Sequence, residues 1–103
     1  LGIVSIEFSN EWGNDPTKEY FIKCIKELSS LDLLRFIKWT TGLASIPYGG
    51  FEKKIKIVPR NRFYAHTCIT VWYFEMERFN SYERFKEKFL MYLASSVNAT
   101  LDD

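Results

Sequence analysis

Two cysteines and one histidine are the residues of this 103-residue chain best suited to nucleophilic or metal chemistry. One cysteine, Cys68, follows Ala65, His66 and Thr67, and we expect it to lie where a loop enters a strand. A thiol with an ordinary pKa near ~8.5 is only roughly 3% thiolate at neutral pH, yet it is already a strong nucleophile. Cys68 is therefore the candidate catalytic nucleophile, a thiol that accepts and passes on an acyl group, with His66 and Thr67 as its supporting loop.

His66 has two possible roles at this position. Residues i and i+2 of an extended backbone face the same side, so the imidazole could donate a hydrogen bond to the Cys68 thiol or lower its pKa. The alternative is a role in packing or in holding the loop. The sequence leaves both open.

The other cysteine, Cys24, lies between Phe21 and Leu28 on the apolar face of a predicted helix. A free cysteine in such a setting behaves as a small hydrophobic side chain. We therefore expect Cys24 to be a core residue without a chemical role.

The small number of histidines and cysteines in the sequence argues against several other thiol chemistries. A papain-type protease needs a histidine from elsewhere in the fold, and His66 is the only one in the sequence. A phosphatase would need a phosphate-cradling loop after the thiol, and a redox enzyme a second cysteine nearby; neither follows Cys68. Three soft ligands are too few for a closed zinc site, and no metal or cofactor is expected.

Composition indicates one soluble domain. The chain is 47% hydrophobic and carries 14 basic and 13 acidic residues, for a net charge of +1. Such a balance supports one packed core and provides no strong field for nucleic acid or an anionic membrane. Because the sequence shows neither a secretory signal nor a membrane span, we expect an intracellular, cytoplasmic or nuclear location.

Hydrophobic periodicity predicts helices first, then strands, then a helix, which indicates an α+β fold. The apolar stripes of the first two helices consist of Tyr20, Phe21, Cys24, Ile25 and Leu28, and of Leu31, Leu33, Leu34, Phe36 and Ile37. The first predicted helix runs over about 16–28, with Asp15 as its cap and Pro16 at its first position. The second is capped by Ser29-Ser30 and stops at Gly42, and the last is capped by Asn80-Ser81 and runs through about Val97. The last helix has Tyr82, Phe85, Phe89, Tyr92 and Leu93 as its stripe, and the tail 98–103 is expected to fray.

Three segments of the sequence carry the composition or alternation typical of β-strands. Alternation or β-branched and aromatic residues predict a short strand or an extended arm at 1–8 and strands at 55–58 and 69–74. Pro47, Gly49 and Gly50 predict a turn-rich connection over 43–51, and 60–67 is predicted as a loop. The aromatic run at 72–74 is expected to be mostly core.

Five segments in register resemble the C-terminal lobe of HECT-type ubiquitin ligases, over about residues 20–95. They are Leu33-Leu34-Arg35-Phe36 with Thr40-Thr41-Gly42, Ile46-Pro47-Tyr48-Gly49-Gly50-Phe51, Ile55-Lys56-Ile57, Ala65-His66-Thr67-Cys68, and Ser81-Tyr82-Glu83 with Lys88-Phe89-Leu90. Each is weak alone, but five in order are specific. The motif around Cys68 is similar to the one that carries that family's catalytic cysteine.

The resemblance implies a fold, a reaction and partners. The fold is a small single lobe of class α/β (α+β), with helices packed on a roughly four-stranded sheet. Cys68 would take ubiquitin from a ubiquitin-conjugating enzyme as a thioester and present it to a lysine of a protein substrate. Residues 16–103 would be the C-terminal lobe, and residues 1–15 a hinge or remnant of a larger N-terminal lobe that recruits the conjugating enzyme. Alone, the chain would be an inefficient ligase.

The sequence departs from the family pattern after the cysteine and in the tail. Ile69 stands where the family usually has phenylalanine, and the tail 99–103 lacks another one. Trp72-Tyr73-Phe74-Glu75-Met76-Glu77 replaces the family's usual proline-containing segment. One alternative is therefore a non-catalytic ubiquitin-binding or protein-interaction domain of the same shape.

A second alternative is a binder of single-stranded nucleic acid. It would use Lys54, Lys56, Arg60 and Arg62, with Tyr64, Trp72 or Tyr73 as stacking faces. The net charge of +1 disfavours it.

Overall fold

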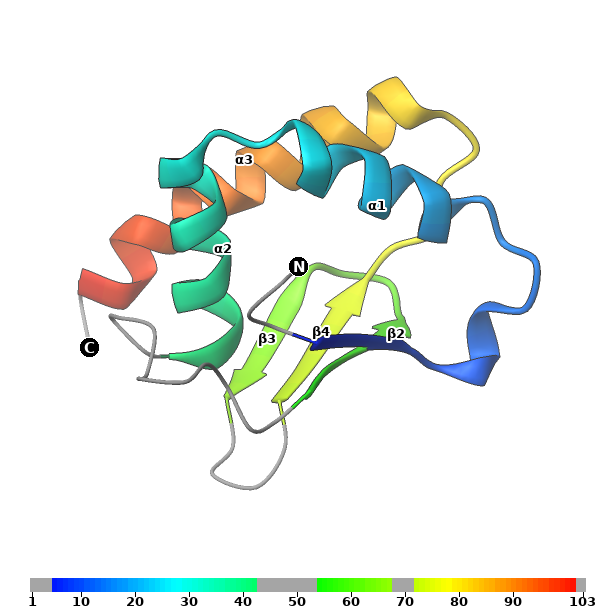
Figure 1. Ribbon diagram of the computed structural model, residues 1–103, viewed down its shortest axis with the longest axis horizontal. Helices are drawn as coiled ribbons and strands as arrows, with labels where there is room; N and C mark the ends of the chain where they lie inside the picture. The colour runs from blue at the N-terminus through cyan, green and yellow to red at the C-terminus, as the bar shows by residue number, and fades with distance from the viewer. Residues whose placement is uncertain (1–4, 43–53, 68–71, 102–103) are drawn as a thin grey trace.

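The computed structural model describes residues 5–42, 54–67 and 72–101, with side chains as far as Ser96. The elements are β1 (Ser5–Phe8), the 3-10 turn η1 (Asn10–Trp12), α1 (Thr17–Glu27), α2 (Ser30–Thr41), β2 (Lys54–Pro59), β3 (Tyr64–Thr67), β4 (Trp72–Met76) and α3 (Tyr82–Leu101). The strands form one sheet of order β1-β2-β4-β3, in which only β3 is antiparallel to its neighbour. The three helices lie on one side of this sheet (Figure 1). This arrangement confirms the predicted α+β lobe with helices on a four-stranded sheet.

Local capping chemistry sets the ends of the first two helices. The Ser29 hydroxyl accepts a hydrogen bond from the Asp32 N–H at 3.1 Å, and Gly42 ends α2 in the left-handed conformation at φ 75°. Both were predicted. At the start of α1 the Asp15 carboxylate accepts from the Thr17 N–H at 2.9 Å, but Pro16 occupies the cap position, one residue later than predicted.

An aromatic core joins the helices to the sheet. Strand alternation points Trp72, Phe74 and Met76 toward the helices, and all three are buried. The Phe74 ring contacts Phe36 of α2 at 5.5 Å and Phe89 of α3 at 6.4 Å between centroids. Full burial of each such side chain contributes roughly 1.5–3 kcal/mol. The prediction that the aromatic run is mostly core is confirmed for Trp72 and Phe74, but not for Tyr73.

The predicted apolar stripe of α2 agrees only in part with the residues that are buried. Phe36 and Ile37 are buried, whereas Leu31 and Leu34 are 59% and 50% exposed. Leu34 precedes Phe36 by two residues, which is about 200° around a helix, so both cannot face the core. The buried face of α2 is the one on which Phe36 contacts the rings of Phe74 and Phe89.

Three other predictions differ from the structure or lie outside it. The segment predicted as a loop over 60–67 contains β3, a short strand that exists because it pairs with β4. The helix α3 continues to Leu101, where fraying was predicted, and no glycine or proline interrupts residues 98–101. The turn-rich connection at 43–51, residues 1–4 and residues 69–71 lie outside the described residues.

Among the described helices, none combines the length and apolar character needed to cross a bilayer.

Candidate functional site

Strand β3 carries two of the three predicted site residues and leads directly to the third. His66 pairs with Tyr73 and Thr67 with Trp72, in antiparallel register with β4. Thr67 is the last residue of the strand, so Cys68 follows it in the chain. Cys68 itself lies outside the described residues, and its role as the nucleophile stays a prediction.

The end of β3 rests against the end of α2. A Cβ atom added to Gly42 would lie 3.5 Å from the Cβ of Thr67, which is ordinary van der Waals contact. The cap glycine thus brings the backbone of α2 close to the strand that precedes Cys68. Two of the segments that the sequence singled out separately, Thr41-Gly42 and His66-Thr67, therefore belong to one part of the molecule.

On the face of the sheet away from the helices, Glu75 of β4 holds the His66 side chain. The imidazole Nε2 and the Glu75 carboxylate oxygen Oε2 share a hydrogen bond. Arg62 donates to the same carboxylate through Nε at 2.9 Å and through its second guanidinium nitrogen at 3.3 Å. The Glu75 side chain is only 12% exposed, and the hydrogen bonds from Arg62, followed by that from His66, lower its pKa from 4.5 to about 2.

Tyr64 of the edge strand β3 contacts both partners of Glu75, His66 and Arg62. The ring of Tyr64 meets the His66 ring edge-on with centroids 4.8 Å apart, and the Arg62 guanidinium lies 4.4 Å from the centre of the Tyr64 ring. His66 therefore has a polar partner in Glu75 and an apolar neighbour in Tyr64. Its imidazole is oriented rather than free on the strand.

A shallow pocket of about 360 Å³ adjoins this cluster. It is lined by Val58, Arg60, His66, Tyr73 and Glu75. These residues come from β2, β3, β4 and the turn after β2. Sequence reasoning singled out neither Glu75 as a site residue nor its link to His66, although alternation places residues 62, 64 and 66 on one side of the chain.

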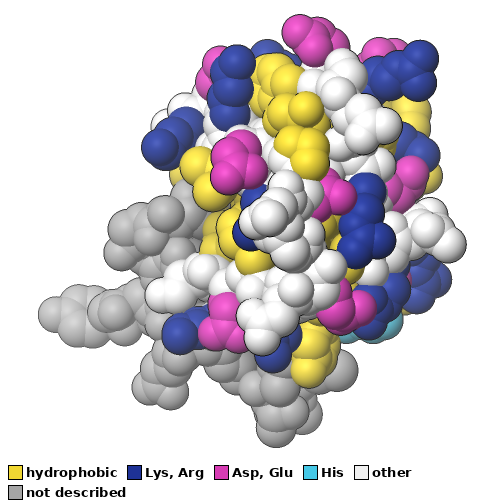
Figure 2. Space-filling view, turned by 90° about the vertical axis from the view of Figure 1, so that its right-hand side faces the viewer, with side chains coloured by type: hydrophobic (Ala, Val, Ile, Leu, Met, Phe, Trp, Pro, Cys, Tyr) yellow, Lys and Arg dark blue, Asp and Glu magenta, His cyan; other side chains and the backbone are white. Residues whose placement is uncertain are grey.

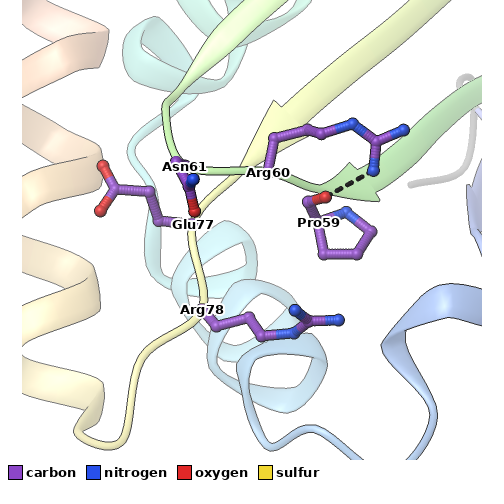
Figure 3. A pocket seen from close by; sticks show the side chains of 5 residues that line it. All are labelled: Pro59, Arg60, Asn61, Glu77 and Arg78. Carbon is purple, nitrogen blue, oxygen red and sulfur yellow. Dashed lines mark hydrogen bonds between the residues drawn. The ribbon is translucent and has the colours of Figure 1, made fainter.

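A second pocket, of about 380 Å³, lies around the turns that follow β2 and β4 (Figure 3). Its charged side chains are already compensated. Arg60 turns back to donate to the Pro59 carbonyl at 2.6 Å and pairs with Glu11 at 3.0 Å. Arg78 pairs with Asp15 at 3.3 Å, and Glu77 with Lys88 at 2.7 Å. No uncompensated charge is left among these residues to recruit an ionic ligand.

Cys24 is buried on α1, as predicted. Desolvation by burial raises the pKa of its thiol from 9.0 to about 11. Because the thiolate is the reactive form, this cysteine is unsuited to nucleophilic work at neutral pH. Within the described ranges, no group of three or more His, Cys, Asp and Glu residues is placed to hold a metal ion.

The residues proposed for nucleic-acid binding are engaged elsewhere. Glu7 pairs with Lys54 at 3.7 Å and with Lys56 at 3.6 Å. Trp72 is buried and offers no stacking face. Figure 2 shows basic and acidic side chains interspersed over one side of the molecule, without a large patch of one sign. These observations argue against the nucleic-acid alternative.

Comparison with protein families identifies the class. The family model described as HECT-domain (ubiquitin-transferase) matches residues 5–99. The chain belongs to the HECT-domain family, and the resemblance to the C-terminal lobe of HECT-type ubiquitin ligases is confirmed. A comparison with curated proteins gives no significant match. HECT domains work with ubiquitin and its conjugating enzymes, so the family assignment places the chain among proteins of ubiquitin transfer.

Proposed function

We propose that Cys68 carries ubiquitin as a thioester. The Cys68 thiolate attacks the thioester carbonyl that joins ubiquitin to a conjugating enzyme; a new C–S bond forms, and the enzyme's own C–S bond breaks. That enzyme's sulfur leaves as a thiolate, which takes up a proton. A lysine of a protein substrate then attacks the new thioester, and ubiquitin is transferred to its nitrogen.

The observation that carries this proposal is the position of β3 in a HECT-domain protein. The strand ends at Thr67, against the cap glycine of α2, and the next residue is the one thiol outside the core helix α1. Exchange of one thioester for another is close to balanced in energy and needs a nucleophile more than it needs strong acid–base catalysis. A site with one thiol and one oriented imidazole is sufficient for that.

The partners and location follow from the same proposal. We propose that ubiquitin, a ubiquitin-conjugating enzyme and a protein substrate meet this chain in the cytoplasm or nucleus. A larger N-terminal lobe would bring the conjugating enzyme close. Without that lobe, loading of Cys68 is expected to be slow.

The test is loading of the purified chain with ubiquitin from a charged conjugating enzyme. The expected product is an adduct seen on a non-reducing gel and removed by a thiol reductant. Cys68→Ala should abolish it, and Cys24→Ala, a matched change of the buried cysteine, should not. An adduct that survives Cys68→Ala contradicts the assignment. Ubiquitin binding without any adduct would instead support the alternative of a non-catalytic ubiquitin-binding domain.

A further inference from the structure

Strand β1 forms one edge of the sheet, and its outer side has main-chain groups available for a further strand. Among the described strands, β1 has β2 as its one neighbour. The Ser9 N–H donates to the Ile57 carbonyl at 2.9 Å, so Ser9 faces β2. Main-chain groups alternate in direction along a strand, so those of Ile6 and Phe8 point away from β2. They are the kind of donors and acceptors that an added strand uses.

A groove of about 600 Å³ adjoins this edge on the side of the sheet that carries the helices. Its lining includes apolar side chains from three elements: Ile6 and Phe8 of β1, Ile22 and Ile25 of α1, and Leu33 of α2. Ile22 is 42% exposed, so this apolar lining is accessible to solvent. The same two residues of β1 therefore present main-chain groups to the edge and apolar side chains to the groove.

The helix-facing side of β1 lacks the usual protection of an edge strand. Such strands commonly carry a proline, a bulge or a charged side chain that points inward. In β1 the residues that point toward the helices are Ile6 and Phe8. The charged residue, Glu7, lies on the opposite face, where it pairs with Lys54 and Lys56. An incoming strand with apolar side chains at alternate positions fits this edge.

The groove also favours one sign of charge in its occupant. Lys26 is the charged residue of the described lining. Within the part of the chain that the structure describes, Lys26 has no ion-pair partner, whereas Lys86 pairs with Glu27 at 3.6 Å. A carboxylate on the incoming strand complements this lysine. Strand β1 of a second copy would not supply it, because its acidic residue, Glu7, lies on the other face of the sheet.

We propose that β1 is the docking site for an extended segment of a partner protein, which adds to the four-stranded sheet beside Ile6 and Phe8. The segment has apolar side chains at alternate positions, which enter the groove beside Ile22, and a carboxylate that pairs with Lys26. Main-chain hydrogen bonds provide affinity, and the groove provides specificity. This interaction goes beyond the function proposed above, because it needs no reactive thiol.

The test uses the whole chain and a capped peptide of about seven residues, close to the length of an ordinary strand. Isoleucine, valine and glutamate occupy alternate positions of the peptide, and serine or threonine the others. Two versions place the glutamate near one end or the other, which covers both directions of the added strand. Fluorescence anisotropy measures the affinity, and amide hydrogen exchange followed by NMR measures the pairing.

The expected result is saturable binding of one version, with slower exchange of the Ile6 and Phe8 amides. The Glu7 amide should change little, because its main-chain groups already face β2. Absence of binding by both versions overturns the proposal. Binding that leaves the exchange of Ile6 and Phe8 unchanged also overturns it.

Ile22→Asp tests the groove. A carboxylate there would be desolvated by the peptide's apolar side chains, so affinity should fall at least about tenfold. Met91→Asp is the matched control, because Met91 is 56% exposed on α3 and is not part of the groove lining. It should leave the affinity unchanged. Equal losses in the two variants would contradict binding at this groove.

A charge exchange tests Lys26 through a gain of binding, which misfolding cannot produce. Lys26→Glu should weaken binding of the glutamate peptide, and a peptide with lysine in place of that glutamate should bind this variant more tightly than it binds the wild type. Lys38→Glu, at an exposed position of α2 outside the lining, should give no such gain. A variant at Lys26 that does not distinguish the two peptides overturns the assignment of the carboxylate.

Methylation of the peptide nitrogens that face β1 tests strand pairing, because it removes the donors and retains the side chains. Affinity should fall at least about tenfold. Unchanged affinity would indicate an apolar pocket without an added strand and overturn the proposal. Protection of Ile6 and Phe8 that rises with protein concentration in the absence of peptide would overturn it as well, because a second copy would then occupy the edge.

The peptide assay and the ubiquitin-loading assay fail independently. A chain that binds the peptide but loads no ubiquitin removes the function proposed above and retains this inference. A chain that loads ubiquitin but binds neither peptide does the reverse.

Discussion

The backbone carbonyl of Ile57 accepts a hydrogen bond of 2.9 Å from the indole Nε1 of Trp12. The same oxygen also accepts from the Ser9 N–H at 2.9 Å, so two groups of the N-terminal segment bind one carbonyl in the middle of β2. Trp12 is buried, and it fastens the turn after β1 to the sheet. Residues 5–12 are thereby part of the packed fold.

Trp12→Phe tests this contact. Phenylalanine fills most of the space but cannot donate, and the Ile57 carbonyl retains only its bond to Ser9. We expect a loss of about 1–2 kcal/mol in the free energy of unfolding, measured by urea denaturation. A variant as stable as the wild type would show that water or a shifted side chain replaces the indole donor.

Gly42→Ala tests the junction between α2 and β3. Gly42 has φ 75°, where a Cβ atom is strained, while the space near Thr67 allows it at 3.5 Å. The cost should therefore come from the backbone and amount to about 1 kcal/mol. Gly42→Asn, which tolerates this conformation better, should cost less. Equal losses for the two variants would point to crowding against Thr67 instead.

Glu75→Gln tests how the ionised carboxylate contributes to stability. Its pKa in the folded protein is about 2, below the ordinary 4.5, so the folded state binds this proton more weakly than the unfolded state does. The stabilisation is complete above pH 4.5 and is lost as the pH falls toward 2. The difference in free energy of unfolding between wild type and variant should be about 1 kcal/mol near neutral pH and shrink below pH 4.5. Glu7→Gln, at a site about half exposed, should show a smaller difference at neutral pH.

The buried thiol gives a prediction that needs no ubiquitin. With its pKa raised to about 11, Cys24 should resist iodoacetamide at neutral pH in the folded chain and react after denaturation. Mass spectrometry of peptides after timed alkylation measures this directly. Modification of native Cys24 at the rate of a free cysteine would contradict its placement in the core.

Phe89 and Leu31 form a matched pair for the core. The Phe89 ring contacts those of Phe21, Phe36 and Phe85 at centroid distances of 6.0, 5.7 and 5.6 Å, whereas Leu31 is 59% exposed. Phe89→Ala should cost about 3–5 kcal/mol, and Leu31→Ala within about 0.5 kcal/mol. Thermal or urea unfolding of the two variants is the measurement. Similar losses would mean that α2 packs through the face that the sequence pattern indicated.

The sequence by itself determined the features that depend on neighbours along the chain. The Ser29 cap, the Gly42 stop and the buried position of Cys24 each follow from capping chemistry or from helical spacing within a few residues. The family also followed from short motifs in order, and residues 5–99 match its model.

Only the tertiary structure decided what depends on pairing between distant segments. Strand β3 has four residues and a weak signal of its own, and it forms because β4 supplies its hydrogen-bonding partners. Leu34 is half exposed because Phe36, about 200° away around the same helix, faces the aromatic core. The contact of Glu75 with His66 requires the antiparallel register of two strands, which places a carboxylate nine residues further along the chain beside the imidazole.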